Sequence, residues 1–222
     1  MAVIIRVWDA PTRLFHWTLS LCVAGLFVTS QVGGTAMDWH FRFGYAVLTL
    51  LLFRSVWGLY GGHWSRFSTF VVRPLLIRRY LQGQGKPQDC VGHNPLGALS
   101  VLTMLAFLSL QLASGLISDD EIAAAGPLVR FVSSTWVGNA TFYHKEIGKF
   151  ILLGLVAMHL GAIAFYYFRK HDNLISPMIT GDKSVPFQAH SARDGAPERR
   201  RAGLIFLACA ALVSSLVIGL NG

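Results

Sequence analysis

Five long apolar runs constrain this chain more than any other feature of its sequence. As a helix, each run is long enough to cross the roughly 30 Å hydrocarbon core of a bilayer. Only 14% of the residues are charged, against about 25% in soluble domains, so the chain lacks the polar surface of a water-soluble fold. The sequence therefore predicts an all-α membrane protein, a four-helix transmembrane bundle with a fifth, C-terminal transmembrane helix. The predicted spans are Leu14–Val32, Phe43–Tyr60, Pro95–Ile117, Ile147–Phe168 and Ala202–Leu220.

The first apolar run is predicted to be a retained helix and not a cleaved signal peptide. It is longer than the roughly 7–15-residue apolar core of a signal peptide, and it contains His16 and Trp17. The first four spans lie in a predicted domain of residues 1–186. Residues 187–222 are predicted to form a polar linker and the last helix.

Lysine and arginine are distributed unevenly between the loops. Because cytoplasmic loops carry an excess of these residues, the pattern predicts a cytoplasmic N-terminus and a periplasmic C-terminus in a bacterial inner membrane. The net charge of +8 then reflects topology and contact with anionic lipid, and it requires no nucleic acid. The outer side would carry Arg42, Arg130 and Lys145, and the inner side Arg6, Arg13, Arg66, Arg73, Arg78, Arg79, Lys86, Arg169, Lys170, Lys183, Arg193 and Arg199 to Arg201.

The three cysteines, Cys22, Cys90 and Cys209, lie far apart in the chain. No C-x-x-C-H motif is present, so the sequence does not predict a covalently attached c-type haem, and no paired-cysteine zinc pattern occurs. An iron–sulfur cluster held by four thiolates is excluded by the number of cysteines.

The eight histidines fall into two groups. Four lie in the predicted inner loops, where exposed histidines are common. The other four lie in or beside the apolar runs, where ionisable residues are rare, face the bundle interior and mark function. The loop histidines are His63, His93, His171 and His190, and the span histidines are His16, His40, His144 and His159.

The positions of the span histidines suggest two pairs at different depths. His144 and His159 are fifteen positions apart, which in an unbroken α-helix is about 22 Å along the axis and about 60° from alignment. His40 and His144 each precede an apolar run by three residues, both on the outer side. On the inner side, His16 matches His159 less closely, and His93 is the alternative partner.

Two histidine pairs within one bundle suit two haem b groups held by axial imidazoles. Haem is a large apolar disc, and helical bundles build cofactor sites from inward-facing side chains. Two imidazoles fill both axial positions of the iron, which favours electron transfer over oxygen binding. The alternatives are four separate polar-network histidines, or a zinc or copper site, for which the pairs are too far apart.

Arg54 lies within the second run, fourteen residues after His40, and so about 21 Å further along a helix. A lone arginine at membrane depth needs an anion, and haem propionates would provide one. The alternative is a side chain that extends to the inner surface.

Several motifs spread along the chain are typical of one family. They include VWDAPTRLFHW at Val7–Trp17, RSVWGLYGGHWSRF at Arg54–Phe67, GHNPLGALSVL at Gly92–Leu102, SGLISDDE at Ser114–Glu121 and FRKHDNLISPMITGDK at Phe168–Lys183. From about residue 7 to residue 186 the chain resembles the bacterial cytochrome b561 group within the Ni/Fe-hydrogenase-type di-haem cytochrome b family.

The resemblance implies that four helices hold two haem b groups. It implies that His16 and His159 bind the inner haem iron, and that His40 and His144 bind the outer one. This pairing agrees with the depths of the histidines. The fifth helix departs from the simpler four-helix members of the family, which leaves the partner open.

The resemblance also implies electron transfer between the quinone pool and a redox partner, such as a c-type cytochrome, a hydrogenase or a reductase. Arg13, His93 and Asn94 are candidate inner-side contacts for quinone or, for the first two, haem propionate. We expect an electron-transfer subunit and not a stand-alone enzyme.

Two alternative functions are a superoxide oxidase that passes electrons to quinone and a haem-containing membrane anchor. A superoxide oxidase would favour basic outer loops that attract the anion, whereas the second outer loop begins with Asp119, Asp120 and Glu121.

Overall fold

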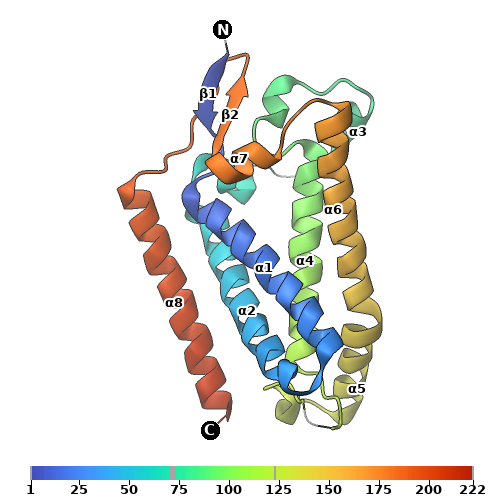
Figure 1. Ribbon diagram of the computed structural model, residues 1–222. Coiled ribbons are helices and arrows are strands. Elements are labelled where there is room, and N and C mark those ends of the chain that lie inside the picture. Colours follow the sequence, from blue (N-terminus) through green and yellow to red (C-terminus); the bar gives the residue numbers. More distant parts are fainter. Residues whose placement is uncertain (1, 71–73, 123, 222) are drawn as a thin grey trace. The chain divides into compact units, whose positions relative to one another are not determined.

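The computed structural model describes residues 2–70, 74–122 and 124–221, so Arg73 lies outside the described residues. Within these ranges, five helical segments are long and apolar enough to cross a membrane. This confirms the prediction of an all-α membrane protein. The long helices are α1 (Ala10–Val32), α2 (Met37–Tyr60), α4 (Pro95–Leu116), α6 (Lys149–Arg169) and α8 (Ala196–Asn221) (Figure 1).

Several helices begin before the apolar runs that predicted them, because a helix continues into polar residues at its ends. The predicted second outer loop is itself partly helical, since it contains α5. The shorter elements are β1 (Val3–Arg6), η1 (Gly34–Ala36), η2 (His63–Ser65), η3 (Phe67–Thr69), α3 (Pro74–Leu81), η4 (Pro87–Cys90), η5 (Val129–Phe131), α5 (Ser134–Phe142), the π-helix η6 (Tyr143–Gly148), α7 (Ile175–Thr180) and β2 (Asp182–Val185).

The chain divides into two compact units, and each contains two of the four span histidines. The His16 unit comprises Met1–Trp17, Phe53–Thr103 and Met158–Ile205. The His40 unit comprises Thr18–Leu52, Met104–Ala157 and Phe206–Gly222.

In the His16 unit, the buried Asp9 connects the start of α1 to the end of α2. Its side chain is 0% exposed. Oδ1 accepts a hydrogen bond from the Thr12 amide at 2.8 Å, so Asp9 is the N-cap of α1. Oδ2 accepts from the Gly62 amide at 3.1 Å and the Ser65 hydroxyl at 2.9 Å, and the Trp57 indole nitrogen lies 3.3 Å from both oxygens.

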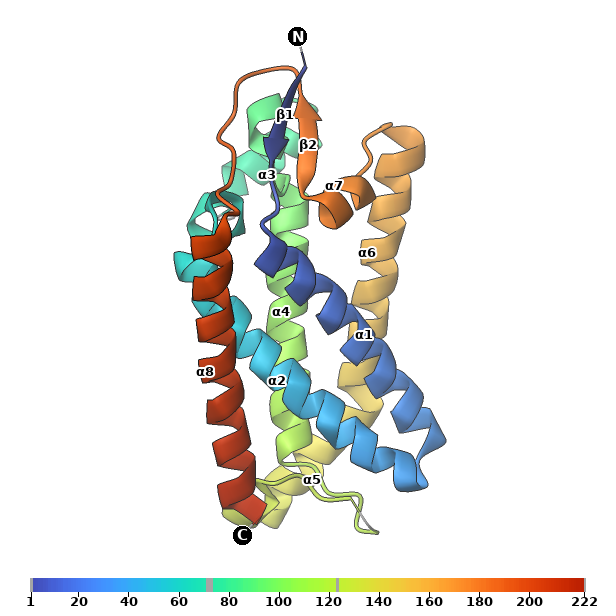
Figure 2. The ribbon, with the colours of Figure 1, turned by 60° about the vertical axis from the view of Figure 1, so that its left-hand side comes forward.

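A two-stranded antiparallel sheet joins the N-terminal segment to the chain after α6. Val3 lies opposite Val185, and Arg6 lies opposite Asp182; Figure 2 shows β1 beside β2. The sheet packs on a small apolar core that includes Ile5, Val7 and Val91. The sequence did not predict this sheet, because strands of four residues leave little periodic signal and the two strands are far apart in the chain.

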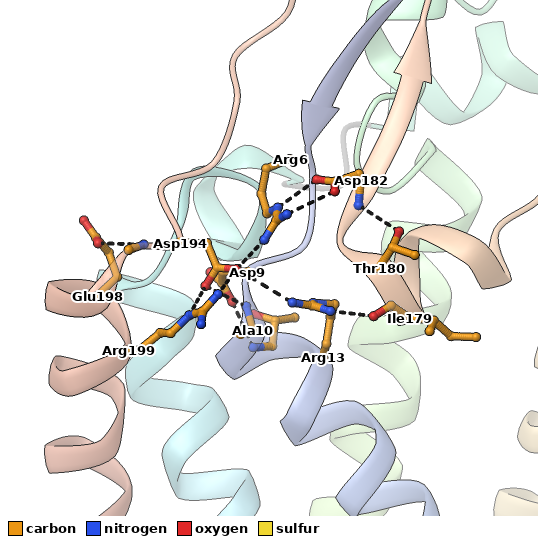
Figure 3. A network of polar contacts seen from close by, with 12 residues as sticks. Arg6, Asp9, Ala10, Arg13, Ile179, Thr180, Asp182, Asp194, Glu198 and Arg199 are labelled. Carbon is orange, nitrogen blue, oxygen red and sulfur yellow. Dashed lines mark hydrogen bonds and ion pairs between the residues drawn. The ribbon is translucent and has the colours of Figure 1, made fainter.

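Asp194 is a hub of ionic contacts in the same unit (Figure 3). Its side chain is 4% exposed and lies 2.7 Å from Arg6 and 3.1 Å from Arg199, which belongs to the first turn of α8. It also accepts a hydrogen bond from the Ala10 amide at 3.1 Å. Burial alone raises the pKa of a carboxyl group, but the hydrogen bonds from Arg199, Ala10 and Arg6 lower the pKa of Asp194.

In the His40 unit, α1 and α2 pack closely where a glycine faces an aromatic ring. A Cβ atom on Gly25 would lie 2.7 Å from the ring of Phe43, so a larger residue there would push the helices apart. Val47, Leu108 and Leu152 are buried in this unit, whereas Leu21 and Val28 of α1 are 71% and 61% exposed. Exposed apolar side chains are expected on the surface of a membrane protein, where they contact lipid.

Candidate functional site

In the His40 unit, the structure brings His40 and His144 together. His40 lies in the first turn of α2, and His144 lies in the π-helix η6. The ring centroids are 6.3 Å apart and the ring planes are nearly perpendicular, at 84°.

Hydrogen bonds fix the proton position on both rings of this pair. Nδ1 of His40 lies 3.1 Å from the Leu26 carbonyl oxygen and 3.2 Å from the Thr29 hydroxyl. Nδ1 of His144 lies 2.9 Å from the Gln111 carbonyl oxygen. Because a carbonyl oxygen can only accept, each Nδ1 carries the proton and donates. Each Nε2 therefore keeps a lone pair with which to bind a metal.

A cavity of about 440 Å³ is lined by this histidine pair. Its walls are mainly apolar and include Leu26, Leu112 and Leu152. Gly44 also lines it, and a Cβ atom at that position would meet no atom within 4 Å. Asp120, Lys145, Glu146 and Lys149 add charged groups of both signs to the lining. A mainly apolar cavity with a few polar groups is typical of a cofactor site.

In the His16 unit, the structure brings His16 and His159 together. Their ring centroids are 6.4 Å apart and their planes are 51° from each other. His16 lies two turns after the N-cap Asp9, and His159 lies in α6.

Buried nitrogen atoms lie close to the His16–His159 pair. Arg54, His159 and His16 lie within electrostatic range of His93. Nδ1 of His93 and Nη1 of Arg54 are buried without a hydrogen-bond partner among the described residues. Arg54 is 4% exposed, so it does not extend to the surface, and its guanidinium lies 4.5 Å from the centre of the Phe67 ring.

The three inner-side candidates from the sequence, His93, Arg13 and Asn94, all contact other parts of the His16 unit. The sequence placed His93 among exposed loop histidines, whereas its ring packs between Trp8 and Phe70 at 4.7 and 4.8 Å. Arg13 donates to the Ile179 carbonyl and lies 3.7 Å from Asp194. Asn94 accepts a hydrogen bond from the Gly97 amide at 2.8 Å and so caps α4.

The spacing of both pairs fits two imidazoles bound to one metal ion. A metal–imidazole bond is about 2.0–2.1 Å long and a ring nitrogen lies about 1.1 Å from its ring centroid, so two trans ligands have centroids about 6.2–6.4 Å apart. The separations are 6.3 and 6.4 Å. Among the described residues, no three His, Cys, Asp or Glu side chains gather as a metal site, so each pair would need a metal held mainly by another group.

Sequence reasoning missed the residues that hold the rings. Thr29, Gln111 and Ser114 contact the histidines from neighbouring helices. The sequence feature that could have identified them is that they are polar residues inside apolar runs. The π-helix was also missed, so the 60° estimate between His144 and His159, which assumed an unbroken α-helix, does not hold.

Membrane-spanning helices that pair imidazoles at this separation define a class, the membrane cytochromes of b type. The chain matches the prokaryotic cytochrome b561 family over residues 7–181 and belongs to that family. It is therefore a multi-pass membrane protein that binds haem b and transfers electrons.

Curated relatives align with most of the chain. A protein of Bradyrhizobium diazoefficiens, named "Probable Ni/Fe-hydrogenase B-type cytochrome subunit", is 24% identical in an alignment of 213 positions that covers 81% of this chain and 85% of the relative. One of Escherichia coli K12, named "Probable Ni/Fe-hydrogenase 1 B-type cytochrome subunit", is 27% identical in an alignment of 216 positions that covers 82% of this chain and 91% of the relative. No solved structure matches the chain significantly.

Proposed function

We propose that the protein binds two haem b groups and carries electrons across the bacterial inner membrane. His16 and His159 would bind one haem iron, and His40 and His144 the other. The support is that both pairs have the ring separation that trans imidazoles require. The Nδ1 hydrogen bonds of His40 and His144 also leave each Nε2 with a lone pair that can bind a metal.

Arg54 and His93 are proposed to receive a propionate of the haem at His16 and His159. Both have a buried nitrogen atom without a partner among the described residues. The buried carboxylate of Asp9 interacts electrostatically with Arg54, but Nη1 of Arg54 has no hydrogen-bond partner among the described residues. A propionate would supply that partner and offset the cost of the buried nitrogen.

Arg13 also has a buried nitrogen, Nε, without a partner among the described residues, but its other two guanidinium nitrogens contact the Ile179 carbonyl and Asp194. Asn94 caps α4. Quinone or propionate contacts at these two residues therefore have less support than at Arg54 and His93.

A bound haem iron would accept and release one electron at a time. The chain's own residues would set the conditions for that exchange. Two imidazoles at each site would hold the haem, which favours electron transfer over oxygen binding. In the His40 unit, the mainly apolar cavity lining would contact the porphyrin. The sequence positions of the pairs suggest one site near each membrane face, with a cytoplasmic N-terminus and a periplasmic C-terminus.

The partners we propose are the quinone pool and a hydrogenase. The names of the relatives support the hydrogenase. A c-type cytochrome or a reductase remains an alternative partner. Superoxide oxidation is less well supported, because Asp120 and Glu146 balance Lys145 and Lys149 in the cavity lining, which leaves no excess positive charge to attract superoxide.

The central experiment is the haem content of purified His144→Ala. A pyridine haemochrome assay should give two haems per chain for the wild type and one for the variant. The matched control is His171→Ala, because His171 is an exposed histidine, and it should retain two. A ratio near two for His144→Ala would exclude His144 as a ligand.

A second experiment separates a conduit from a membrane anchor. If the protein is a conduit, quinol or purified hydrogenase should reduce its haem rapidly in detergent. If haem reduction by both donors is slow, the anchor function is favoured. Superoxide-dependent reduction of quinone would instead identify a superoxide oxidase.

A further inference from the structure

The helix that carries His144 is locally widened. A π-helix of six residues, Tyr143–Gly148, lies between α5 and α6. Such segments are rare and are frequent at functional sites. A π-turn must be held by its surroundings, because an α-helix is the more stable conformation of most sequences.

Gln111 of α4 holds this turn through its side chain and its backbone. Its side-chain nitrogen Nε2 donates to the His144 carbonyl at 3.0 Å. Its backbone carbonyl accepts from Nδ1 of His144 at 2.9 Å. The Ser114 hydroxyl, one turn further along α4, lies 3.2 Å from the same nitrogen. The histidine is thus fixed at its backbone and at its ring.

Two glycines leave the room that this arrangement needs. A Cβ atom on Gly115 would lie 2.8 Å from Cε1 of His144, and a Cβ atom on Gly148 would lie 1.9 Å from Oε1 of Gln111. Separations under about 3 Å are repulsive for carbon and oxygen atoms. The close approach of Gln111 and His144 therefore depends on these two positions having no side chain.

We propose that Gln111 is a positioning residue for His144, which sets how firmly and in which orientation the imidazole binds haem iron. This inference rests on the proposed haem ligation by His40 and His144. Gln111 acts through His144 and touches no iron. Without the Nε2 hydrogen bond, the π-turn relaxes and the bond between Nδ1 and the Gln111 carbonyl weakens. A weaker bond makes the imidazole less basic, so the ferric iron is less stabilised and the midpoint potential rises.

The test is Gln111→Met, which keeps the length of the side chain but removes the donor. Its matched control is Ser109→Ala on the same helix, where the hydroxyl of Ser109 is exposed and bonds only to the Leu105 carbonyl within α4. Transfer of haem to apomyoglobin should be about 10–100-fold faster for Gln111→Met than for the wild type, because loss of a ligand-orienting contact typically weakens metal binding by that factor. Only the haem that is absent from His144→Ala should change its potential and its electron paramagnetic resonance signal.

A second variant covers the case in which Gln111→Met retains no haem. Gln111→Asn keeps an amide group but shortens the side chain by one methylene, so the donor no longer reaches the His144 carbonyl. Its haem-transfer rate should therefore exceed that of the wild type. A rate equal to that of the wild type would overturn the proposal.

The outcomes separate this inference from the proposed function. If the wild type contains two haems and His144→Ala contains one, but Gln111→Met matches Ser109→Ala in transfer rate, potential and spectrum, the role of Gln111 is wrong and the haem ligation stands. If His144→Ala still contains two haems, the ligation is wrong and the role of Gln111 fails with it.

Discussion

Asp9 provides the sharpest test of how the N-terminal end of the fold is held. Replacement by alanine removes the acceptor for the Thr12 and Gly62 amides, the Ser65 hydroxyl and the Trp57 indole. Ser65 keeps a partner in the Thr12 hydroxyl at 2.7 Å, whereas the Gly62 amide and the buried Trp57 indole lose theirs. Each buried donor left unsatisfied costs about 1–3 kcal/mol, and the lost N-cap about 1 kcal/mol.

The free energy of unfolding should therefore fall by about 3–7 kcal/mol in Asp9→Ala. For a chain of this size, each kcal/mol lowers the melting temperature by about 2–4 °C, so the expected decrease is about 6–28 °C. The assay is the fraction of detergent-solubilised protein that remains monodisperse on size exclusion after heating.

Asp38→Ala is the matched control, since Asp38 is an exposed acid in the first turn of α2. It should lose only its interaction with the helix dipole, about 0.3–1 kcal/mol. A melting temperature for Asp9→Ala equal to that of Asp38→Ala would refute the role assigned to the buried carboxylate.

Four further changes test other parts of the structure. Gly115→Ala should perturb the haem at His40 and His144, seen in its redox spectrum, whereas Gly138→Ala, where a Cβ atom meets nothing within 4 Å, should not. Arg54→Leu should lower the midpoint potential of the haem at His16 and His159, because a buried positive charge favours the reduced iron; the exposed Arg66→Leu is its control. Asp194→Asn should lower the melting temperature at pH 7, and the difference from the wild type should shrink as the pH falls below about 4. The reason is that folding lowers the pKa of this carboxyl group. Its contribution to stability is complete above the pKa of the unfolded state and is lost as the pH falls through the pKa of the folded state. Tags at the two termini should be accessible from opposite sides of the membrane, and two tags on one side would contradict five spans.

The sequence predicted the long helices well because each depends on a local property. An apolar run of membrane length forms a helix wherever it lies in the chain, since the bilayer leaves backbone groups no other partner. The N-caps Asp9 and Asn94 were predictable for the same reason, because a cap depends on residues within one turn.

The features that the sequence did not predict depend on residues far apart in the chain. Asp194 looks like one acid in a polar linker, and only the fold shows that Arg6 and Arg199 converge on it. The hydrogen bond from Gln111 to His144 connects two different helical segments. The π-helix that contains His144 has no sequence signature comparable to that of a helix cap. Pairing of the four histidines was predicted from their depths, and the structure brings the same pairs together, whereas their role as haem ligands stays a prediction.

Because β1 and β2 are far apart in the chain, they can pair only late in biosynthesis. Arg6 is made before the four spans of the bundle, but its partners Asp182 and Asp194 leave the ribosome only after the fourth span. At about 5–20 residues per second, the N-terminal segment waits roughly 10–40 s for them. During that interval β1 has no strand to pair with, and Arg6 and Arg13 have no carboxylate at residue 194 to contact. A nascent chain arrested before residue 182 should therefore expose its first residues to protease, and an arrested chain that protects them would show that the wait does not occur.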